Sequence, residues 1–372
     1  MPQKVVTLAT RKGLLIYVQK SSGWHLVNES FVGVGVSLSE MDPRDGSLYA
    51  MLDHGHYGCK LHRWDGFLGD DWTAQDNWVE LAPPAYPEGS KLKDGNDAVL
   101  KYQWAMSFGT TGQPGRVYIG TEPGGLFFSE DRCDMISLCR SLWDHPSRLD
   151  DSPGWMGGGR DHPGLHSICV DPDDENTVRI GISCAGVFES NDSLGTWQVR
   201  NKGLRADFMP DPNMEIGHDP HLLVQCESEP DKLWQQNHCG IFRSTDRGCT
   251  WSDVSEPEGP ARFGFTIVVN PTNGDQAWVV PAVADQNRVA VDRALCVCMT
   301  EDGGRSWTSF REGLPQLNCY DFVLRHCLYA SGANMVMGTV GGSFYFSADF
   351  GESWELVNGN LPLIYGARIY EV

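Results

Sequence analysis

The eight residues SADFGESW, Ser347 to Trp354, decide the fold, because near copies of them recur along the chain. The copies are STDRGCTW (244–251), TEDGGRSW (300–307) and the looser SNDSLGTW (190–197). Each follows a short apolar run and precedes another strand-like run, which places it in the turn of a repeated hairpin. In such a turn Ser, Thr and Asp side chains bond to nearby backbone N–H groups, and glycine accepts positive φ. The chain is therefore built from one repeated part.

The spacing of these turns predicts the number of repeats. The four turns begin 54, 56 and 47 residues apart, and a degraded copy, GGLFFSED, ends at Asp131. Two further segments, GCKLHRW (58–64) and GLLIYV (13–18), occupy the same place in their repeats, which makes seven units. A four-stranded antiparallel unit repeated at this period is typical of a β-propeller. We predict an all-β fold: a seven-bladed propeller.

The two ends of the chain are expected to meet in one blade. The first unit supplies only three strands, KVVTLAT, LLIYV and WHLV, and lacks an inner strand. The C-terminal segment 366–372, which contains ARIYEV, is predicted to supply that strand and close the ring. Residues 1–372 are therefore expected to form a single domain.

The repeated turn resembles the Asp-box, or BNR repeat, of the sialidase superfamily. The chain as a whole is similar to bacterial BNR-repeat glycosyl hydrolases and exo-α-sialidase-like proteins, and this resemblance implies a glycosidase. Sialidases carry an [FY]RIP motif near their start, whereas this chain has ATRKGLL, so Arg11 is only a loose counterpart of their first arginine. Their Tyr–Glu pair has no clear counterpart, which argues against cleavage of sialic acid by the usual route.

Composition limits the partners and the compartment. The chain has 29 basic and 49 acidic residues, a formal net charge of −20, which disfavours binding to nucleic acid or to an anionic membrane. No signal peptide or membrane span is apparent, so a cytoplasmic protein is expected. The 12 cysteines form no CxxC pair, and we expect free, mostly buried thiols. The oligomeric state is left open.

Topology predicts which face carries the chemistry. In an antiparallel blade, the loop before the first strand and the loop between the second and third strands emerge on the same face, here called the leading face. Three long irregular loops, 143–164, 205–220 and 283–293, belong to it, whereas the Asp-box turns lie opposite. Seven of the 11 histidines are expected on or near the leading face, and His326 is among the four placed elsewhere.

The histidines of this face predict a metal site. His166, His221 and His238 come from two neighbouring units, and the segment DHGH adds His54 and His56 from across the ring. Neutral imidazoles beside carboxylates suit one divalent transition metal, either zinc, manganese or iron. The alternative for each histidine is an ordinary hydrogen-bonding loop residue. No organic cofactor is expected.

The remaining site residues are predicted by their chemistry. His218 and Asp219 form the expected general acid–base pair, and Arg11 and Arg262 are further catalytic candidates. Arginines clamp carboxylates or phosphates, and aromatic rings pack on substrates. The predicted substrate contacts are Trp104, Arg160, Arg205 and Phe263.

These residues predict a hydrolase or lyase that acts on a small polar or carbohydrate-derived substrate at the mouth of the central channel. The alternative is a propeller without chemistry that binds a ligand or acts as an assembly scaffold. Convergence of histidines favours the enzyme, because a protein-docking face would more often expose aromatic residues and arginines.

Overall fold

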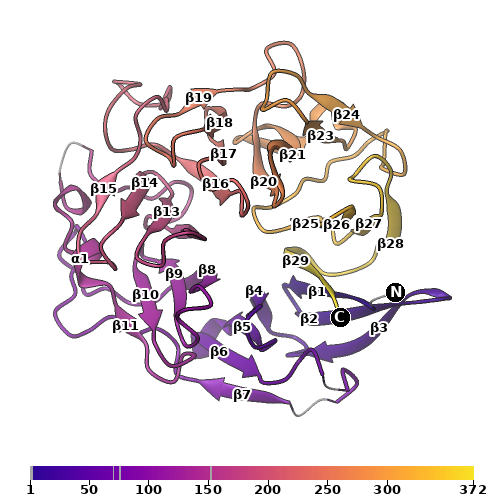
Figure 1. Ribbon diagram of the computed structural model, residues 1–372, viewed down its shortest axis with the longest axis horizontal. Coiled ribbons are helices and arrows are strands. Elements are labelled where there is room, and N and C mark those ends of the chain that lie inside the picture. Colours follow the sequence, from indigo (N-terminus) through magenta and orange to yellow (C-terminus); the bar gives the residue numbers. More distant parts are fainter. Residues whose placement is uncertain (1–2, 70, 75–76, 151–152) are drawn as a thin grey trace.

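Seven four-stranded antiparallel blades surround a central channel in the computed structural model of the protein (Figure 1). The model describes residues 3–69, 71–74, 77–150 and 153–372, so Asp151 and Ser152 of the predicted loop 143–164 lie outside the described residues. The seven sheets confirm the predicted seven-bladed propeller. None of the helices in these ranges has the length and apolarity needed to span a bilayer.

The first three blades follow the predicted strand order. The first consists of β29 (Ile364–Glu371), β1 (Lys4–Thr10), β2 (Gly13–Lys20) and β3 (Gly23–Ser30). The second consists of β4 (Gly35–Met41), β5 (Leu48–Asp53), β6 (Cys59–Trp64) and β7 (Trp78–Leu81). The third consists of β8 (Tyr102–Phe108), β9 (Val117–Glu122), β10 (Leu126–Ser129) and β11 (Ser137–Leu138).

The last four blades repeat the pattern. The fourth consists of β12 (Leu165–Val170), β13 (Val178–Ile182), β14 (Gly186–Ser190) and β15 (Gln198–Val199), and the fifth of β16 (Pro220–Gln225), β17 (Leu233–Asn237), β18 (Gly240–Ser244) and β19 (Ser252–Asp253). The sixth consists of β20 (Gly264–Asn270), β21 (Asn273–Ala284), β23 (Val297–Thr300) and β24 (Thr308–Phe310). The seventh consists of β25 (Leu328–Ser331), β26 (Asn334–Gly338), β27 (Phe344–Ser347) and β28 (Glu355–Asn358). Short helices α1 (Arg140–Trp143) and η2 (Pro146–Arg148) follow the third blade.

The C-terminal strand closes the ring as predicted. β29 pairs with β1 in antiparallel register from Lys4 opposite Glu371 to Leu8 opposite Ala367. Ala367 and Ile369 are fully buried against neighbouring blades. Figure 1 shows both ends of the chain in this blade. The observed strand, 364–371, begins two residues before the predicted segment.

The Asp-box turns are held by a repeated set of hydrogen bonds. In the last box the Ser347 hydroxyl donates to Asp349 Oδ1 at 2.6 Å and accepts the Gly351 N–H at 2.9 Å. The Asp349 carboxylate also accepts the Ser353 N–H at 3.0 Å. The boxes that begin at Ser190, Ser244 and Thr300 make the same bonds. The box side chains are therefore used within the turn.

Replacing Asp349 with alanine should lower the free energy of unfolding at pH 7 by about 1–3 kcal/mol, because the turn donors lose their acceptor. Burial raises the pKa of Asp349, but hydrogen bonds from Ser347 and Ser353 outweigh it, so the net pKa is lowered. A lowered pKa stabilises the fold above the unfolded value of about 3.9, and this contribution is lost as pH falls below that value. Urea unfolding of the variant and the parent at pH 7 and pH 3 measures the difference in their free energies of unfolding.

The variant Asp349→Asn is the matched control for the charge. Its deficit relative to the parent protein should be present at pH 7 and should shrink in acid, since the parent carboxylate is then protonated. A deficit independent of pH would contradict the role of the charge.

Three local predictions differ from the structure. The run YDFVLRH (320–326) was expected to be an inner strand, but β25 begins only at Leu328. Its alternation reflects burial of Val323 in an irregular segment whose backbone pairs with residues of other loops. The predicted loop 283–293 contains the end of β21, a fifth strand β22 (Asn287–Ala290) and the short helix η3 (Val291–Arg293).

The DHGH segment is also not extended. It forms the short helix η1 (Gly55–Tyr57), with Gly55 and Gly58 both at positive φ.

All 12 cysteines are unpaired and nine of them are buried, as expected from the sequence.

Candidate functional site

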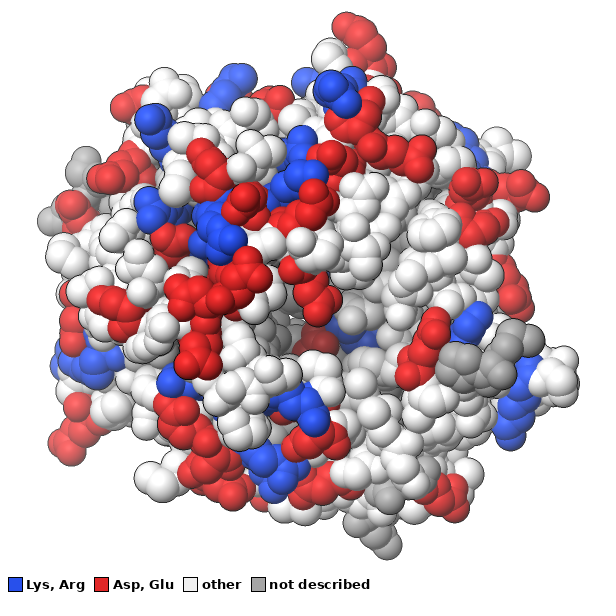
Figure 2. All heavy atoms as spheres, in the orientation of Figure 1, with Lys and Arg blue, Asp and Glu red and all other residues white. Residues whose placement is uncertain are grey.

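A cavity of about 650 Å³ opens on the leading face at the mouth of the channel. Loops before first strands and loops between second and third strands line it, together with the inner strands. The space-filling view shows one face of the propeller hollowed at its centre, with acidic and basic side chains interspersed around the hollow (Figure 2). The predicted face therefore carries the pocket.

A repeated β-bulge turns inner-strand side chains towards the channel. In six blades the register of the inner strand shifts by an extra residue near its leading end. Bulges re-aim side chains and are frequent beside active sites. The residues at these irregular positions include Ser37, Trp104, His166, His221, Phe265 and Tyr365. All of these except His166 line the pocket.

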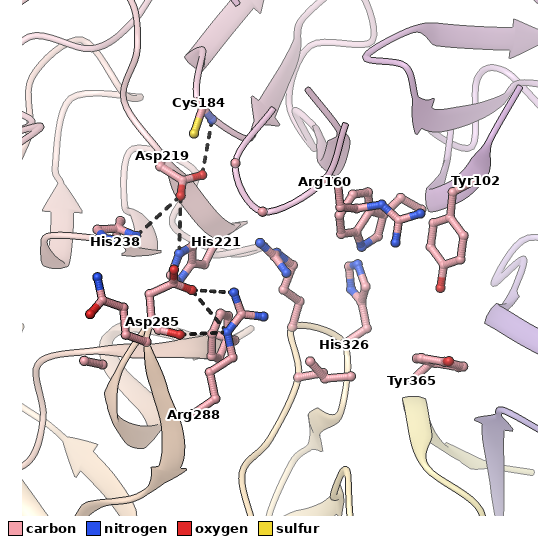
Figure 3. Close-up of a pocket in the computed structure, with 18 of the residues that line it drawn as sticks. Tyr102, Arg160, Cys184, Asp219, His221, His238, Asp285, Arg288, His326 and Tyr365 are labelled. Atoms are coloured by element: carbon pink, nitrogen blue, oxygen red, sulfur yellow. Dashed lines mark hydrogen bonds and ion pairs between the residues drawn. The ribbon is translucent and has the colours of Figure 1, made fainter. Parts of the chain in front are cut away.

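The pocket wall of the fifth blade holds one carboxylate between two imidazoles. Asp219 Oδ2 lies 3.6 Å from His221 Nε2 and 3.6 Å from His238 Nδ1. The three ligand atoms all lie within 4.8 Å of one another. Asp219 immediately precedes β16, and His221 lies on that strand. His238 immediately follows β17, and its backbone N–H donates to the Asp219 carbonyl. Figure 3 shows both histidines beside the Asp219 carboxylate.

Hydrogen bonds hold this group and assign one tautomer. His221 Nδ1 lies 2.6 Å from the Gly264 carbonyl, which can only accept, so Nδ1 carries a proton. In the neutral ring Nε2 then presents a lone pair to the carboxylate. A cation or a second proton between them would relieve the repulsion of lone pair and carboxylate. Zinc bonds of about 2.0–2.2 Å in a tetrahedral site separate two ligands by about 3.3–3.6 Å, so the observed 3.6 Å fits a metal.

The electrostatics of the group favour an ionised carboxylate. Burial raises the pKa of Asp219, but His221, His238 and Arg325 outweigh it, so the pKa lies well below its usual range. Burial lowers the pKa of His221, whereas the bond to Asp219 raises the pKa of His238. The Cys184 N–H donates to the other Asp219 oxygen at 3.2 Å. One carboxylate oxygen is therefore anchored and the other faces the two imidazoles.

Charged pairs flank this group around the pocket. Arg288 pairs with Asp285 on the β21–β22 hairpin. Arg160 pairs with the buried Glu122 and lies over the ring of Trp104, 5.2 Å from its centroid. Figure 3 shows Asp285 and Arg288 on the same side of the pocket as Asp219, with Arg160 and His326 across from them. The pocket therefore carries polar side chains on opposite walls, and Tyr102 and Tyr365 lie beyond Arg160 and His326 (Figure 3).

Five of the predicted site residues meet in this pocket, namely Trp104, Arg160, Asp219, His221 and His238. Phe263 lies behind the histidines, with its ring 5.4 Å from His221 and 5.8 Å from His238.

Two predicted histidines are buried outside the group. His166 is fully buried on β12, and its Nδ1 lies 2.9 Å from the Ser167 hydroxyl. It lines a second cavity instead, and burial lowers its pKa well below the usual value. His218 directs Nε2 to the Met214 carbonyl at 2.6 Å. The imidazole partners of Asp219 are therefore His221 and His238 rather than the predicted His218.

The other predicted residues lie away from the pocket lining. His54 and His56 pack against Tyr57 in the η1 turn, because the turn replaces the expected extended segment. Arg205 is exposed and pairs with Asp207. Arg262 is exposed and donates to the Pro257 carbonyl, and Arg11 is exposed in the β1–β2 turn.

Sequence reasoning missed part of the pocket. Arg325 and His326 line it from the segment that was predicted to be a strand, and Phe265, Asp285 and Arg288 complete it. Asp285 and Arg288 belong to loop 283–293, which was recognised as part of the leading face, so its charged residues could have been included. Nothing in the alternation of YDFVLRH marked Arg325 as a pocket residue.

Comparison with known proteins gives one curated relative. The chain is 25% identical over 224 residues to an oligoxyloglucan-reducing end-specific xyloglucanase of Emericella nidulans (strain FGSC A4). The match covers 55% of this chain, which spans about a quarter of the relative's length (24%). No protein-family model matches, so the sialidase-superfamily resemblance remains a prediction.

Solved structures support the fold. An ancestral GH74 enzyme matches 91% of this chain and 38% of its own, with a TM-score of 0.55 and 16% identity. The match to the periplasmic gluconolactonase of Pseudomonas aeruginosa covers 100% of this chain and 99% of the gluconolactonase, with a TM-score of 0.58 and 10% identity. The match to a YCF48 protein bound to a D1 peptide covers 100% of this chain and 97% of the YCF48 chain, with a TM-score of 0.53 and 12% identity. At these identities the similarity is one of fold.

Proposed function

We propose that the protein is a hydrolase or lyase that acts on a small polar or carbohydrate-derived substrate in the leading-face pocket. The observation that carries the proposal is the Asp219, His221 and His238 group, whose atoms lie at metal-ligand separation on the pocket wall. The name of the xyloglucanase relative supports a carbohydrate as substrate. We propose that the group holds one divalent transition metal, either zinc, manganese or iron.

Three residues would hold the metal. Asp219 would bind it through Oδ2, His221 through Nε2, and His238 through Nδ1. A divalent cation held there would polarise a bound water or a substrate oxygen. The Gly264 carbonyl orients the His221 ring, and Phe265 stacks on it with a centroid distance of 4.8 Å. Partners of this kind fix the tautomer and direction of a ligating imidazole.

The other pocket residues bind and orient the substrate. Trp104 offers an aromatic ring that is half-buried in the pocket, and Arg160 lies above it. The pocket is large enough for a compact sugar-sized molecule, since ligand sites commonly measure about 300–1,000 Å³. If no metal is bound, His238 is the imidazole better placed to exchange protons with bound molecules, because it is more accessible than His221.

A propeller without chemistry is the second candidate. The YCF48 structure bound to a D1 peptide has a similar fold at a similar level of identity, so the fold agrees equally with a protein that binds peptide. Such a role does not require two imidazoles around one buried carboxylate.

Elemental analysis of the full chain, purified without chelator or nickel resin, tests the proposal. About one equivalent of zinc, manganese or iron is expected, and less than about a tenth of an equivalent contradicts the metal. A screen of sugars, lactones and esters then tests turnover. His238→Ala should abolish it with little shift of the melting profile, whereas His221→Ala should abolish it and lower the melting temperature, because His221 is buried and bonded to the Gly264 carbonyl. Unchanged turnover in both variants removes these residues from the mechanism.

A further inference from the structure

Arg325 lies on the floor of the pocket. It belongs to the irregular segment between β24 and β25 and lines both the pocket and the second cavity of about 480 Å³. Its guanidinium carbon lies 5.2 Å from the ring centroid of Trp104 and 5.7 Å from that of Phe265. These rings come from inner strands of two different blades, β8 and β20. The charge is therefore held within the channel between aromatic faces.

The Arg325 guanidinium has no counter-ion in the described part of the chain. None of the carboxylates there lies within 4.0 Å of it, and its Nε is buried without a hydrogen-bond acceptor. The acidic residues nearby are already engaged: Glu122 with Arg160, and Asp285 with Arg288. Asp219 faces His221 and His238.

Arg325 is half-buried as a residue, and its Nε is fully buried. An unpaired cation in such a place is costly, because the protein interior solvates charge poorly. Burial lowers the pKa of Arg325 to about 10, with Asp219 opposing the shift and Arg288 and Arg160 adding to it. The side chain therefore stays positive at neutral pH beside two other guanidiniums. A bound anion would offset this cost, and a neutral ligand would not.

The surroundings select the kind of anion. A guanidinium presents a planar fork of donors that matches a carboxylate. The rings of Trp104 and Phe265 already lie against guanidinium groups. Tyr365 adds aromatic surface to the same pocket, which suits the apolar face of a sugar ring. The Asp219 group lies on the wall of this pocket, within reach of the rest of a sugar-sized ligand.

We infer that the pocket binds a sugar acid, whose carboxylate pairs with Arg325 while the remainder of the molecule extends towards Asp219, His221 and His238. This inference names the substrate class of the proposed hydrolase or lyase and rests on that function only for the reaction, not for the binding. A preference for a sugar acid would distinguish the protein from an enzyme that acts on neutral sugar chains.

Calorimetric titration of the full chain with D-glucuronate and with D-glucose tests the inference, because the two sugars differ mainly in the carboxylate. Glucuronate should bind more tightly. Arg325→Met removes the charge and keeps much of the length of the side chain, and it should weaken glucuronate binding about 10- to 100-fold while leaving glucose unaffected. Its melting temperature should equal or exceed that of the parent, since an unpaired charge has been removed.

Arg140→Met is the matched control, because Arg140 is exposed, pairs with Asp144 and lies outside the pocket lining. It should bind glucuronate as the parent does. Equal binding of both sugars, no binding of glucuronate, or undiminished binding by Arg325→Met would each overturn the inference. A tighter complex with glucose 6-phosphate than with glucuronate would overturn the carboxylate assignment. Asp219→Asn should retain the glucuronate preference even where turnover is lost, so the binding inference and the proposed reaction can fail separately.

Discussion

Asp219→Asn should lose the proposed transition metal and more than about 100-fold in kcat/KM, and its melting temperature should fall, because the lowered pKa of Asp219 means that its charge stabilises the fold. Residues that merely support metal ligands already cost about 10- to 100-fold when removed, and Asp219 would be a ligand itself. An asparagine oxygen can still accept the Cys184 N–H that Asp219 accepts at 3.2 Å. The amide is neutral, however, and no longer supplies an anionic oxygen between His221 and His238. Elemental analysis and the turnover found in the substrate screen measure both losses.

Asp285→Asn is the matched control for that experiment. Asp285 lines the same pocket, but its carboxylate pairs with Arg288 and lies outside the three-residue group. This variant should keep its metal content. A full equivalent of metal in Asp219→Asn, or equal losses in both variants, would contradict the assignment of Asp219 as a ligand.

Deleting residues 367–372 should abolish cooperative folding. The deletion removes most of β29, and with it the register pairs from Lys4 to Leu8 on β1. It also removes the buried side chains of Ile369 and Tyr370 and the ion pair of Arg368 with Glu40. Each large buried side chain contributes about 3–5 kcal/mol, so the sum approaches the whole stability of an ordinary domain. Circular dichroism and urea unfolding of the deleted chain provide the measurement.

Glu371→Ala is the control for the deletion. Glu371 is exposed at the end of β29 and bonds through its side chain only to Asn334 in the described residues. Its unfolding midpoint should stay close to that of the parent. A cooperative transition of parental midpoint in the deleted chain would show that the ring does not depend on this strand.

The fold was predictable because it depends on local repeats. Each Asp-box network joins residues at most four positions apart, as between Ser347 and Gly351, so the sequence alone contains its geometry. The degraded copy behaves in the same way, since the Ser129 hydroxyl donates to Asp131 and accepts the Cys133 N–H. The phase of these turns also predicted correctly which face carries the pocket.

The site was predictable only in part, since its residues come from many blades. Asp219, His221 and His238 lie together at the leading end of the hairpin formed by β16 and β17, and two of them were expected to act as metal ligands. His166 was expected to join them, but its position on β12 places it in the second cavity. His54 and His56 were assigned from an extended segment that is a helical turn.

The sequence by itself determined the seven blades, their phase and the closure by the C-terminal strand, because hydrophobic alternation and turn chemistry act over a few neighbouring residues. Only the tertiary structure decided which side chains enter the channel. Bulges in the inner strands turn Trp104, His221 and Phe265 inwards, and the late start of β25 leaves Arg325 on the pocket floor. Those positions depend on register and on packing between blades, so alternation along one strand does not contain them.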